Sequence, residues 1–580
     1  MAEYLSPGVY VEEFDSGSKP MEGVSTSTAG FIGLTQRGMT SGLPQLITNF
    51  ADFKRKYGGY LSENEFGEYR FLAYAVEHFF VNGGSRCFVM RVAPEDAKAA
   101  EGFLPKEDGA VLKITAKNPG TWGNQMQVVI SPASKAKTQV LEIVSEGDKK
   151  KYKVKKAAGF RTGDIVAYQA PEGETVVYNK VVKCQDNILE FAEEFAEDII
   201  DVELLPTKFI TSCECNLEVK FDDIVEFYEN ISFNLSEANY IAKKLEKSDL
   251  IVVEHIVSEE EQMLPPFVQV AGDEKMAIAT LSFSGGSDGS LSAISAADFI
   301  GTDQGAGKRS GIQAFVDNDM VSVMAVPGVT DPNVALSLVA HCENLASRFA
   351  VLDMPRQAIK IDDMLAHRDM FDSTYAALYH PWLTVFDPLD KRNIAIPPSG
   401  SMMGIYARSD NTRGVHKAPA NEVVRACTGL DCQFNKGEQD ILNPKGINLI
   451  RAFPGMGIRV WGARTVSSDG SWKYINVRRL FIFVEESIKA NTNWVVFEPN
   501  DETLWVRVKR TIEVFLTGLW RNGSLAGTSS GEAFFVDIGK STMSQDDIDN
   551  GRLICVIGIA PVKPAEFVIF RITQKTSEAS

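Results

Sequence analysis

The sequence predicts a multidomain α/β protein whose two ends are strand-like arms. With 580 residues, of which 44% are hydrophobic and 10% aromatic, the chain can bury several cores and should form roughly three or four domains. Strand-like and helix-like segments alternate through much of its length. Each end carries a short run of β-branched and aromatic residues with no adjacent strand to pair with. Such ends predict strands that must find their partners elsewhere.

The N-terminal arm is predicted over residues 1–25. It contains a strand-like run from Tyr4 to Phe14, interrupted early by the Pro7-Gly8 turn. Asp15 to Pro20 is a polar linker and not a two-residue hairpin turn, so this strand must find its partner elsewhere.

An α/β core is predicted over residues 26–100 and 281–450. Asp331 followed by Pro332 is typical of a helix start, and the helix that follows lies between two apolar runs, which predicts a βαβ unit with parallel strands. The expected strands are Ala29 to Leu34, Cys87 to Val92, Ala314 to Val316, Val321 to Val326 and Phe349 to Leu352, with helices over Phe50 to Tyr57 and Tyr69 to Phe80.

A mostly-β insertion is predicted over residues 101–280, where short alternating segments are separated by polar turns. The basic run Lys149 to Lys156 has two interpretations, a nucleic-acid patch or a solvated hairpin face. We favour the hairpin face, because the run alternates and the whole chain is acidic.

An α+β domain is predicted over residues 451–564, followed by a C-terminal arm strand over residues 565–580. Asn500 is expected to cap a helix whose apolar stripe runs from Leu504 to Leu519. Arg507, Arg510 and Arg521 recur on another edge of this helix, which is either a solvated edge or a contact surface. The last two expected strands are Leu553 to Ile559 and Phe567 to Thr573.

The charge of the chain disfavours nucleic-acid binding. Asp and Glu (77) outnumber Lys and Arg (59), giving a net charge of -18. Residues 451–580 differ, with 16 basic and 14 acidic side chains, which indicates that this part faces another partner. Met1 to Val11 lacks the pattern of a secretory signal, and no apolar run reaches the ~18 residues of a membrane span. We expect folding in the cytoplasm, no membrane insertion and no direct contact with nucleic acid.

No pattern predicts catalysis, a cofactor or a metal. The eight cysteines lack the paired spacing of a zinc site, and the six histidines suggest no catalytic triad. The run Gly301 to Ser310 superficially resembles a phosphate loop, but Thr302 and Arg309 stand where that loop needs glycine and serine or threonine. We expect no catalytic, cofactor-binding or metal-binding residues.

Several segments, in order along the chain, closely resemble phage tail sheath proteins. They include Leu5 to Glu13, Gly30 to Gly33, Asn82 to Val92, Pro119 to Asn124, Gly285 to Gly289, Asn443 to Asn448, Val460 to Thr465, Asn476 to Leu480 and Phe497 to Asp501. The insertion near 130 to 280 carries little of this resemblance.

The resemblance implies a non-enzymatic subunit of a contractile sheath, stacked in helical rings around an inner tail tube and contracting to drive the tube through a target cell envelope. It implies a subtilisin-like α/β core without the protease's catalytic triad, and as partners other copies of the chain, the tube, the baseplate and the tail terminator. The implied inter-subunit arm residues are Val9, Tyr10, Val11, Glu12, Phe14, Phe567, Val568, Ile569, Phe570 and Ile572. A C-terminal helix would contact the tube, through Arg507, Arg510 and Arg521.

Two alternatives remain open: another structural component of the same machine, associated with the baseplate or the tube, and a divergent α/β hydrolase. The sequence does not separate a complete phage from a tailocin or another injection system, and the particle would be made in the cytoplasm of a bacterial host.

Overall fold

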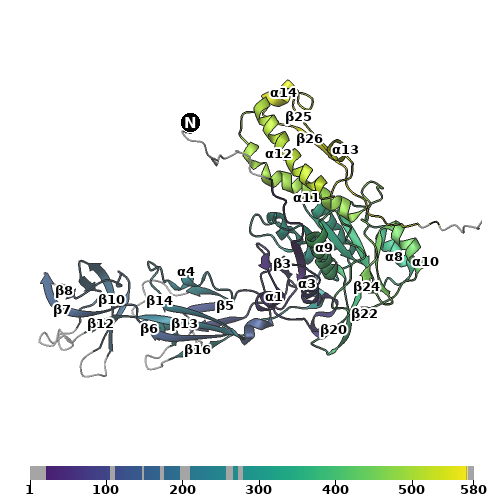
Figure 1. The fold of residues 1–580 in the computed structure, drawn as a ribbon. Coiled ribbons are helices and arrows are strands. Elements are labelled where there is room, and N and C mark those ends of the chain that lie inside the picture. The colour runs from purple at the N-terminus through teal and green to yellow at the C-terminus, as the bar shows by residue number, and fades with distance from the viewer. Residues whose placement is uncertain are drawn as a thin grey trace, which may run out of the picture. The chain divides into compact units, whose positions relative to one another are not determined.

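The structure, a computed structural model, describes residues 21–104, 111–146, 149–169, 176–195, 209–255, 265–271, 278–569 and 571. The chain divides into two compact units, which Figure 1 draws as ribbons. Of the described residues, the first unit comprises those within 21–35, 40–92 and 295–571, and the second those within 36–39 and 93–294. The finer division into arms, core, insertion and C-terminal domain stays a prediction. No described helix is both long and apolar enough to cross a lipid bilayer.

An eight-stranded sheet forms the centre of the first unit, in the order β2-β3-β1-β17-β18-β19-β23-β24. These strands span Gln45–Ile47 (β2), Cys87–Val92 (β3), Ala29–Leu34 (β1), Val323–Ala325 (β17), Phe349–Asp353 (β18), Ala376–His380 (β19), Ile447–Phe453 (β23) and Gly457–Val460 (β24). Within the sheet, the pairings from β3 to β23 are parallel, and the edge strands β2 and β24 pair antiparallel. Strands β1 and β3 are buried at every position, as expected for parallel strands covered on both faces.

Helices α3 (Leu72–Val81) and α9 (Ser399–Arg413) pack on this sheet and against each other (Figure 1). Gly400 and Gly404 lie one turn apart on α9 and face the α3 backbone. A Cβ atom at these positions would lie 2.3 Å from the carbonyl oxygen of Ala75 and 2.4 Å from that of Phe79. The two glycines therefore set how closely the helices approach, because any larger residue would force them apart.

The predicted βαβ unit is confirmed. Helix α7 (Pro332–Leu345) begins after Asp331, whose side chain accepts a hydrogen bond from the Asn333 amide, and it connects the parallel strands β17 and β18. The predicted strand from Ala314 to Val316 is wrong, because this segment lies in a 3₁₀ helix, Gly311–Asp317. A three-residue apolar run fits a buried helical turn as well as a strand, so periodicity could not separate them.

Shorter elements complete the body of the first unit. They are α1 (Phe50–Tyr57), α2 (Glu63–Phe66), α6 (Ala296–Ile300), α8 (Ile361–Arg368), α10 (Lys436–Leu442) and a sheet of β21 (Arg392–Ile396), β20 (Leu383–Asp387) and β22 (Gly429–Leu430).

The C-terminal part of the first unit contains α11 (Ile475–Asn491), α12 (Glu502–Arg521), α13 (Ser530–Ala533), β25 (Phe534–Ile538), α14 (Gln545–Asp549) and β26 (Cys555–Ile559). Asp501, and not the predicted Asn500, caps α12: its side chain accepts a hydrogen bond of 2.8 Å from the Leu504 amide. The Asn500 side chain instead accepts a hydrogen bond from the indole of Trp505. The predicted apolar stripe of α12 is buried in a core shared with α11 and β25.

The second unit is built mostly of strands. One part consists of the sheets β14-β13-β6-β16 and β15-β5-β4 around a shared core, and the other is a closed barrel, β10-β11-β8-β7-β12-β9. The elements are β4 (Glu101–Leu104), β5 (Leu112–Ala116), β6 (Gln127–Ala133), β7 (Lys137–Glu146), β8 (Lys149–Val154), β9 (Ile165–Gln169), β10 (Val176–Gln185), β11 (Ile188–Phe191), β12 (Phe209–Ser212), β13 (Glu214–Phe221), β14 (Ile224–Ile231), α4 (Ile241–Leu245), β15 (Ile251–His255), α5 (Pro266–Ala271) and β16 (Ala279–Ser282).

The basic run of the second unit lies in β8 and faces carboxylates on neighbouring strands. Lys153 lies 3.3 Å from Glu142 on β7, and Lys151 lies 3.6 Å from Glu190 on β11. These ion pairs support the hairpin-face interpretation over a nucleic-acid patch, because the lysines already have carboxylate partners.

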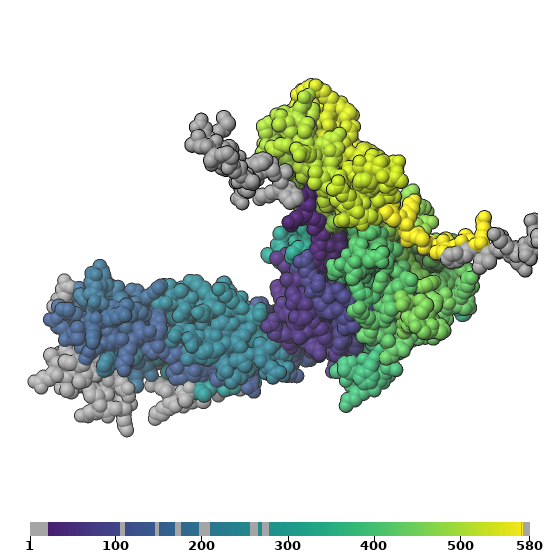
Figure 2. Space-filling view, in the orientation of Figure 1, coloured from purple at the N-terminus to yellow at the C-terminus, as the bar shows by residue number. Residues whose placement is uncertain are grey.

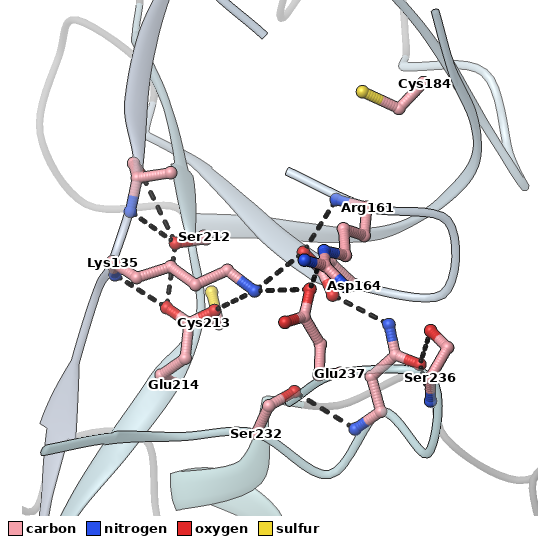
Figure 3. Close-up of polar contacts among 12 residues, drawn as sticks. Lys135, Arg161, Asp164, Cys184, Ser212, Cys213, Glu214, Ser232, Ser236 and Glu237 are labelled. Carbon is pink, nitrogen blue, oxygen red and sulfur yellow. Dashed lines mark hydrogen bonds and ion pairs between the residues drawn. The ribbon is translucent and has the colours of Figure 1, made fainter. Parts of the chain in front are cut away.

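A cluster of charged side chains joins the barrel to the adjoining sheets at the point where the chain passes between them (Figure 3). The ammonium of Lys135, between β6 and β7, lies 3.1 Å from Asp164, 3.4 Å from Glu214 and 2.9 Å from Glu237. Asp164 precedes a barrel strand, and Glu237 follows β14 of the adjoining sheet. Lys135 therefore ties together carboxylates from both parts.

Burial makes this cluster electrostatically strong. Burial by itself would lower the pKa of Lys135, but the hydrogen bond to Glu237 and the attraction of Asp164 and Glu214 outweigh it, and the pKa is raised. Burial also raises the pKa of Glu214, despite hydrogen bonds from the Lys135 amide and the Ser212 hydroxyl. The lysine contacts all three of these largely buried carboxylates, and Arg161 adds a second cation 3.3 Å from Glu237.

Replacing Lys135 with methionine should destabilise the second unit by about 3 kcal/mol, because it leaves three carboxylates facing one another without their central cation. Urea unfolding of the full chain measures this loss. The deficit should shrink as the pH falls through the raised pKa of Glu214, since protonation of this carboxyl removes part of the repulsion.

Lys155→Met is the matched control, because Lys155 is exposed near the end of β8. Its free energy of unfolding should stay within about 0.5 kcal/mol of the wild-type value. Equal free energies of unfolding for Lys135→Met and Lys155→Met would show that the cluster does not stabilise the unit.

Candidate assembly sites

Serine or cysteine side chains meet a histidine at three places in the described part of the chain. The pairs are Ser401 with His78 (3.4 Å), Ser524 with His416 (2.9 Å) and Cys432 with His380 (3.7 Å). No carboxylate hydrogen-bonds any of these three histidines among the described residues, so none of the pairs has the acid that orients a catalytic triad.

The protonation behaviour of these pairs also differs from that of a catalytic site. Burial lowers the pKa of His78 to about 4 and raises the pKa of Cys432 to about 11. A general base needs a pKa nearer the working pH, and a nucleophilic cysteine needs a lowered pKa. These groups therefore match structural side chains better than catalytic ones.

Two stretches have the Gly-x-Ser-x-Gly spacing of a hydrolase nucleophile elbow, centred on Ser287 and Ser529. The elbow requires a sharp turn between a strand and a helix. Ser287 instead lies in an isolated bridge to Lys98, and Ser529 follows a loop and precedes the four-residue α13. No histidine bonds to either serine in the described ranges, so the spacing alone gives no nucleophile.

The loop from Gly301 to Ser310 is held by charge pairing within the protein. Arg309 lies 2.8 Å from Asp303 and 2.5 Å from Asp317, so this guanidinium is already paired with carboxylates of the protein. Among the described residues, no group of three or more His, Cys, Asp or Glu side chains is placed to hold a metal ion.

Helix α11 holds the first described residues of the chain near its C-terminal end. The Asn491 side chain accepts a hydrogen bond from the Glu22 amide (3.3 Å) and donates one to the Glu22 carbonyl (2.8 Å). The Val24 amide donates to the Ser487 hydroxyl (3.1 Å). The segment through which an N-terminal arm joins the body is therefore fixed on this helix.

A buried ion pair secures the next residues. Arg479 of α11 and Asp410 of α9 form two hydrogen bonds of 2.9 and 2.5 Å, and each side chain is only 4% exposed. The Thr26 hydroxyl donates to Asp410 (2.6 Å), and its carbonyl accepts from Arg479 (2.9 Å). One contact thus joins the N-terminal segment, the core helix α9 and the C-terminal helix α11.

The other end of α11 holds the last described residues. The Asn476 side chain, in the first turn, donates to the Val562 carbonyl (3.1 Å), and the hydroxyl of Tyr474 donates to Glu566 (3.0 Å). Segments from the two ends of the chain therefore meet opposite ends of one helix. The outermost of these attachments, at Asn491 and Asn476, are 15 residues apart and are therefore separated by roughly 22 Å along the axis of α11.

The predicted C-terminal arm residues leave the surface after Glu566. Phe567, Val568 and Ile569 are 74%, 68% and 79% exposed, and they lie outside any strand of their own chain. Figure 2 shows these last described residues, in yellow, extending from the surface. Phe570 and Ile572, together with Val9, Tyr10, Val11, Glu12 and Phe14, lie outside the described residues.

The strands β25 and β26 form a two-stranded antiparallel sheet in the C-terminal part. Among the described residues, these two strands form no ladder with any other strand. Each therefore has one edge whose backbone groups can pair with an added strand. Phe535 on β25 and Val556 on β26 are 57% and 45% exposed, so an added strand would also meet apolar side chains.

The three predicted tube-contact residues lie together on the exposed face of α12. Arg507, Arg510 and Arg521 are all exposed, and in the described chain none of them forms an ion pair with a carboxylate. The Arg507 guanidinium lies 4.5 Å from the ring centroid of Trp494. The face thus combines unpaired positive charge with the exposed valines Val506 and Val514.

Three connecting residues went unnoticed in the sequence: Asp410, Arg479 and Glu566. Arg479 lies inside Asn476 to Leu480, one of the segments that resemble sheath proteins, and a charged residue on the apolar side of a helix signals a buried partner. Nothing in the sequence indicates that this partner is 69 residues away.

Comparisons with known proteins agree with this arrangement. Residues 305–466 match the family model described as the phage tail sheath protein central domain, and residues 467–575 match the phage tail sheath C-terminal domain. The two matches are adjacent and together cover the C-terminal half of the sheet and the helices α11 and α12.

A prophage major tail sheath protein described as putative, from Pseudomonas aeruginosa strain UCBPP-PA14, is 26% identical over 285 residues, which are 47% of this chain and 71% of the relative. The tail sheath protein of Escherichia phage P2 is 24% identical over 47% of this chain and 69% of its own length. The fold matches the sheath complex of an extracellular contractile injection system in its contracted state, with a TM-score of 0.52, 21% identity and 99% coverage of both chains. The chain belongs to the phage tail sheath family and is a structural subunit of a contractile tail sheath.

Proposed function

We propose that this sheath subunit polymerises around an inner tail tube through strand addition by its two arms, and that contraction of the polymer drives the tube through a target cell envelope. The observation that carries the proposal is the apolar segment Phe567 to Ile569, which leaves the body exposed and unpaired. A soluble subunit gains nothing from exposing three consecutive large apolar side chains, whereas a polymer can bury them at an interface.

The open sheet of β25 and β26 is the proposed acceptor. Strand addition forms a row of backbone hydrogen bonds, and it places alternate side chains of the added strand against the existing sheet. A two-stranded sheet is marginal by itself, so added strands from neighbouring copies would also stabilise the acceptor. Repeating such a head-to-tail contact without closure produces a helical filament.

The proposed body is a subtilisin-like α/β core without that protease's chemistry. The mainly parallel sheet flanked by helices supports the core. Among the described residues, no carboxylate hydrogen-bonds a histidine of the three pairs, which supports a scaffold. For the same reason we favour the sheath subunit over the alternative, a divergent α/β hydrolase. The subunit would be made in the cytoplasm of the bacterial host and would end its polymer at baseplate and terminator proteins.

The arginine face of α12 is the proposed contact with the tube. Exposed, unpaired guanidinium groups are suited to carboxylates on a partner, because their fork of donors matches a carboxylate. The tube surface that this face meets should therefore be acidic, and the attraction should weaken as salt rises.

Removing either arm should leave a folded monomer that cannot form sheaths, because each deletion removes the strand and leaves the body intact. The two variants are a deletion of Tyr4 to Phe14 and a truncation after Glu566. Circular dichroism measures folding and negative-stain electron microscopy measures assembly. Normal striated polymers from either variant would count against strand addition by that arm.

Reversing the charge of the α12 face, by Arg507→Glu, Arg510→Glu and Arg521→Glu together, should lower co-assembly with the tube protein at least tenfold at low salt, since repulsion replaces attraction. Co-sedimentation with preformed tubes measures it. The matched control reverses Lys489, Lys509 and Lys540, which are 69%, 42% and 79% exposed elsewhere on the same domain. An equal loss in both triple variants would mean that net charge, and not this face, governs assembly.

A serine-hydrolase probe should not label the purified chain above the level of the heat-denatured chain. Labelling that is lost on replacing Ser401 or Ser524 would revive the hydrolase alternative.

A further inference from the structure

The chain forms a strap between the end of β26 and Glu566, running from the C-terminal helical part to the core. Ala560 begins the strap, with hydrogen bonds of 2.8 Å from its amide to the Ala533 carbonyl and from the Ala526 amide to its carbonyl. The Asn476 side chain holds the strap at Val562. Glu566 is the last described residue with a polar side-chain contact to the body.

The carboxylate of Glu566 accepts four hydrogen bonds. Arg464 supplies two of them in bidentate geometry, 2.8 Å from Nε and 2.6 Å from Nη2. Asn443 donates a third (2.7 Å), and the Tyr474 hydroxyl donates the fourth (3.0 Å). Bidentate, charge-assisted bonds of this kind are among the strongest polar contacts in proteins.

The groups around Glu566 are themselves fixed. Arg464 and Tyr474 form an isolated antiparallel bridge, and Asn443 begins the short 3₁₀ turn after α10. The side chains of Glu566 and Arg464 are only 18% and 11% exposed, so little water can replace the bonds. Burial alone would raise the pKa of Glu566, but the bonds from Arg464 and Asn443 outweigh it, and the pKa is lowered.

Attachment ends abruptly at this residue. Glu566 has four hydrogen bonds, whereas the next three residues are largely exposed and make no described polar contact with the body. Next to the strap lies a cavity of about 920 Å³ whose wall includes Arg413, Lys436 and Arg451.

We infer that Glu566 is the fixed anchor of the C-terminal arm, against which a neighbouring copy pulls when it binds the residues that follow. The inference rests on the proposed strand addition by the arms, and it identifies the residue that transmits the load. The anchor stays closed in the assembled sheath, and the free arm begins at Phe567.

Loss of the anchor has a defined geometric effect. The next attachment upstream is Val562, four residues earlier, so release of Glu566 lengthens the free arm by roughly 13 Å of extended chain. A longer and slack arm transmits less force between two subunits. It also no longer fixes the register in which its strand pairs with the neighbouring subunit.

Cleavage of the monomer by chymotrypsin after Phe567 tests the anchor directly, because a protease needs several residues of free chain on both sides of the bond. Glu566→Gln should speed this cleavage about tenfold. Arg464→Gln should have the same effect, and it leaves the sequence around the cleaved bond unchanged. Asp440→Asn is the control, since Asp440 lines the same cavity and is exposed.

Rates within twofold of the wild type for both anchor variants would overturn the inference. Thermal unfolding followed by circular dichroism establishes that each variant is folded. Tyr474→Phe removes one of the four hydrogen bonds and keeps the ion pair, so it should give a two- to threefold faster cleavage even if the larger changes prevent folding. If Tyr474→Phe, Glu566→Gln and Arg464→Gln are all cleaved at the wild-type rate, Glu566 is not an anchor.

Sheath yield separates this inference from the proposed function. In sedimentation of assembled polymer, Glu566→Gln and Arg464→Gln should lower the yield at least tenfold, with Asp440→Asn equal to the wild type. If truncation after Glu566 leaves assembly intact, the proposed arm function fails. If truncation abolishes assembly but both anchor variants assemble as well as the wild type, only the anchor is wrong.

Discussion

The buried ion pair between Arg479 and Asp410 is the contact on which the arrangement of the first unit depends. Two desolvated charges are stable only when each is satisfied by the other and by neighbouring hydrogen bonds. Asp410 has that satisfaction only when α11 lies beside α9 and when Thr26 is in place. The same contact therefore fixes the C-terminal helices on the core and holds the chain in place at Thr26.

Polar side chains in the described part of the core hold helix ends in place. Asp353, at the end of β18, accepts hydrogen bonds from the amide and hydroxyl of Ser399 at the start of α9, and burial raises its pKa to about 6. In a hydrolase such a carboxylate would face a histidine, whereas here it holds a helix terminus. Polar groups that resemble catalytic parts in a sequence serve in this protein to fix helices to the sheet.

The sequence predicted the regular elements well and the long-range contacts poorly. Strands β1 and β3 and helices α1 and α7 follow from local periodicity and capping, because those signals lie within the segments themselves. The segment from Ala314 to Val316 was misassigned because three apolar residues contain no period. Glu566 could not be assigned a role, because its partners Asn443 and Arg464 lie 123 and 102 residues away. The arginines of α12 lie exposed on one face, as their spacing predicts, and the sequence carries no signal for what this face would contact.

Helix α11 carries the attachments of both chain ends at its opposite ends, and this has a consequence for any lattice built from the subunit. A helix is stiff, whereas an extended peptide bends, so in the proposed polymer each copy would be a stiff unit joined to its neighbours by short extended segments. Such a polymer would change its height and diameter by rotation of the subunits, while every linking segment stays attached at both of its ends. The number of residues in each linking segment, and not the strength of any one interface, would then set how far the polymer can shorten.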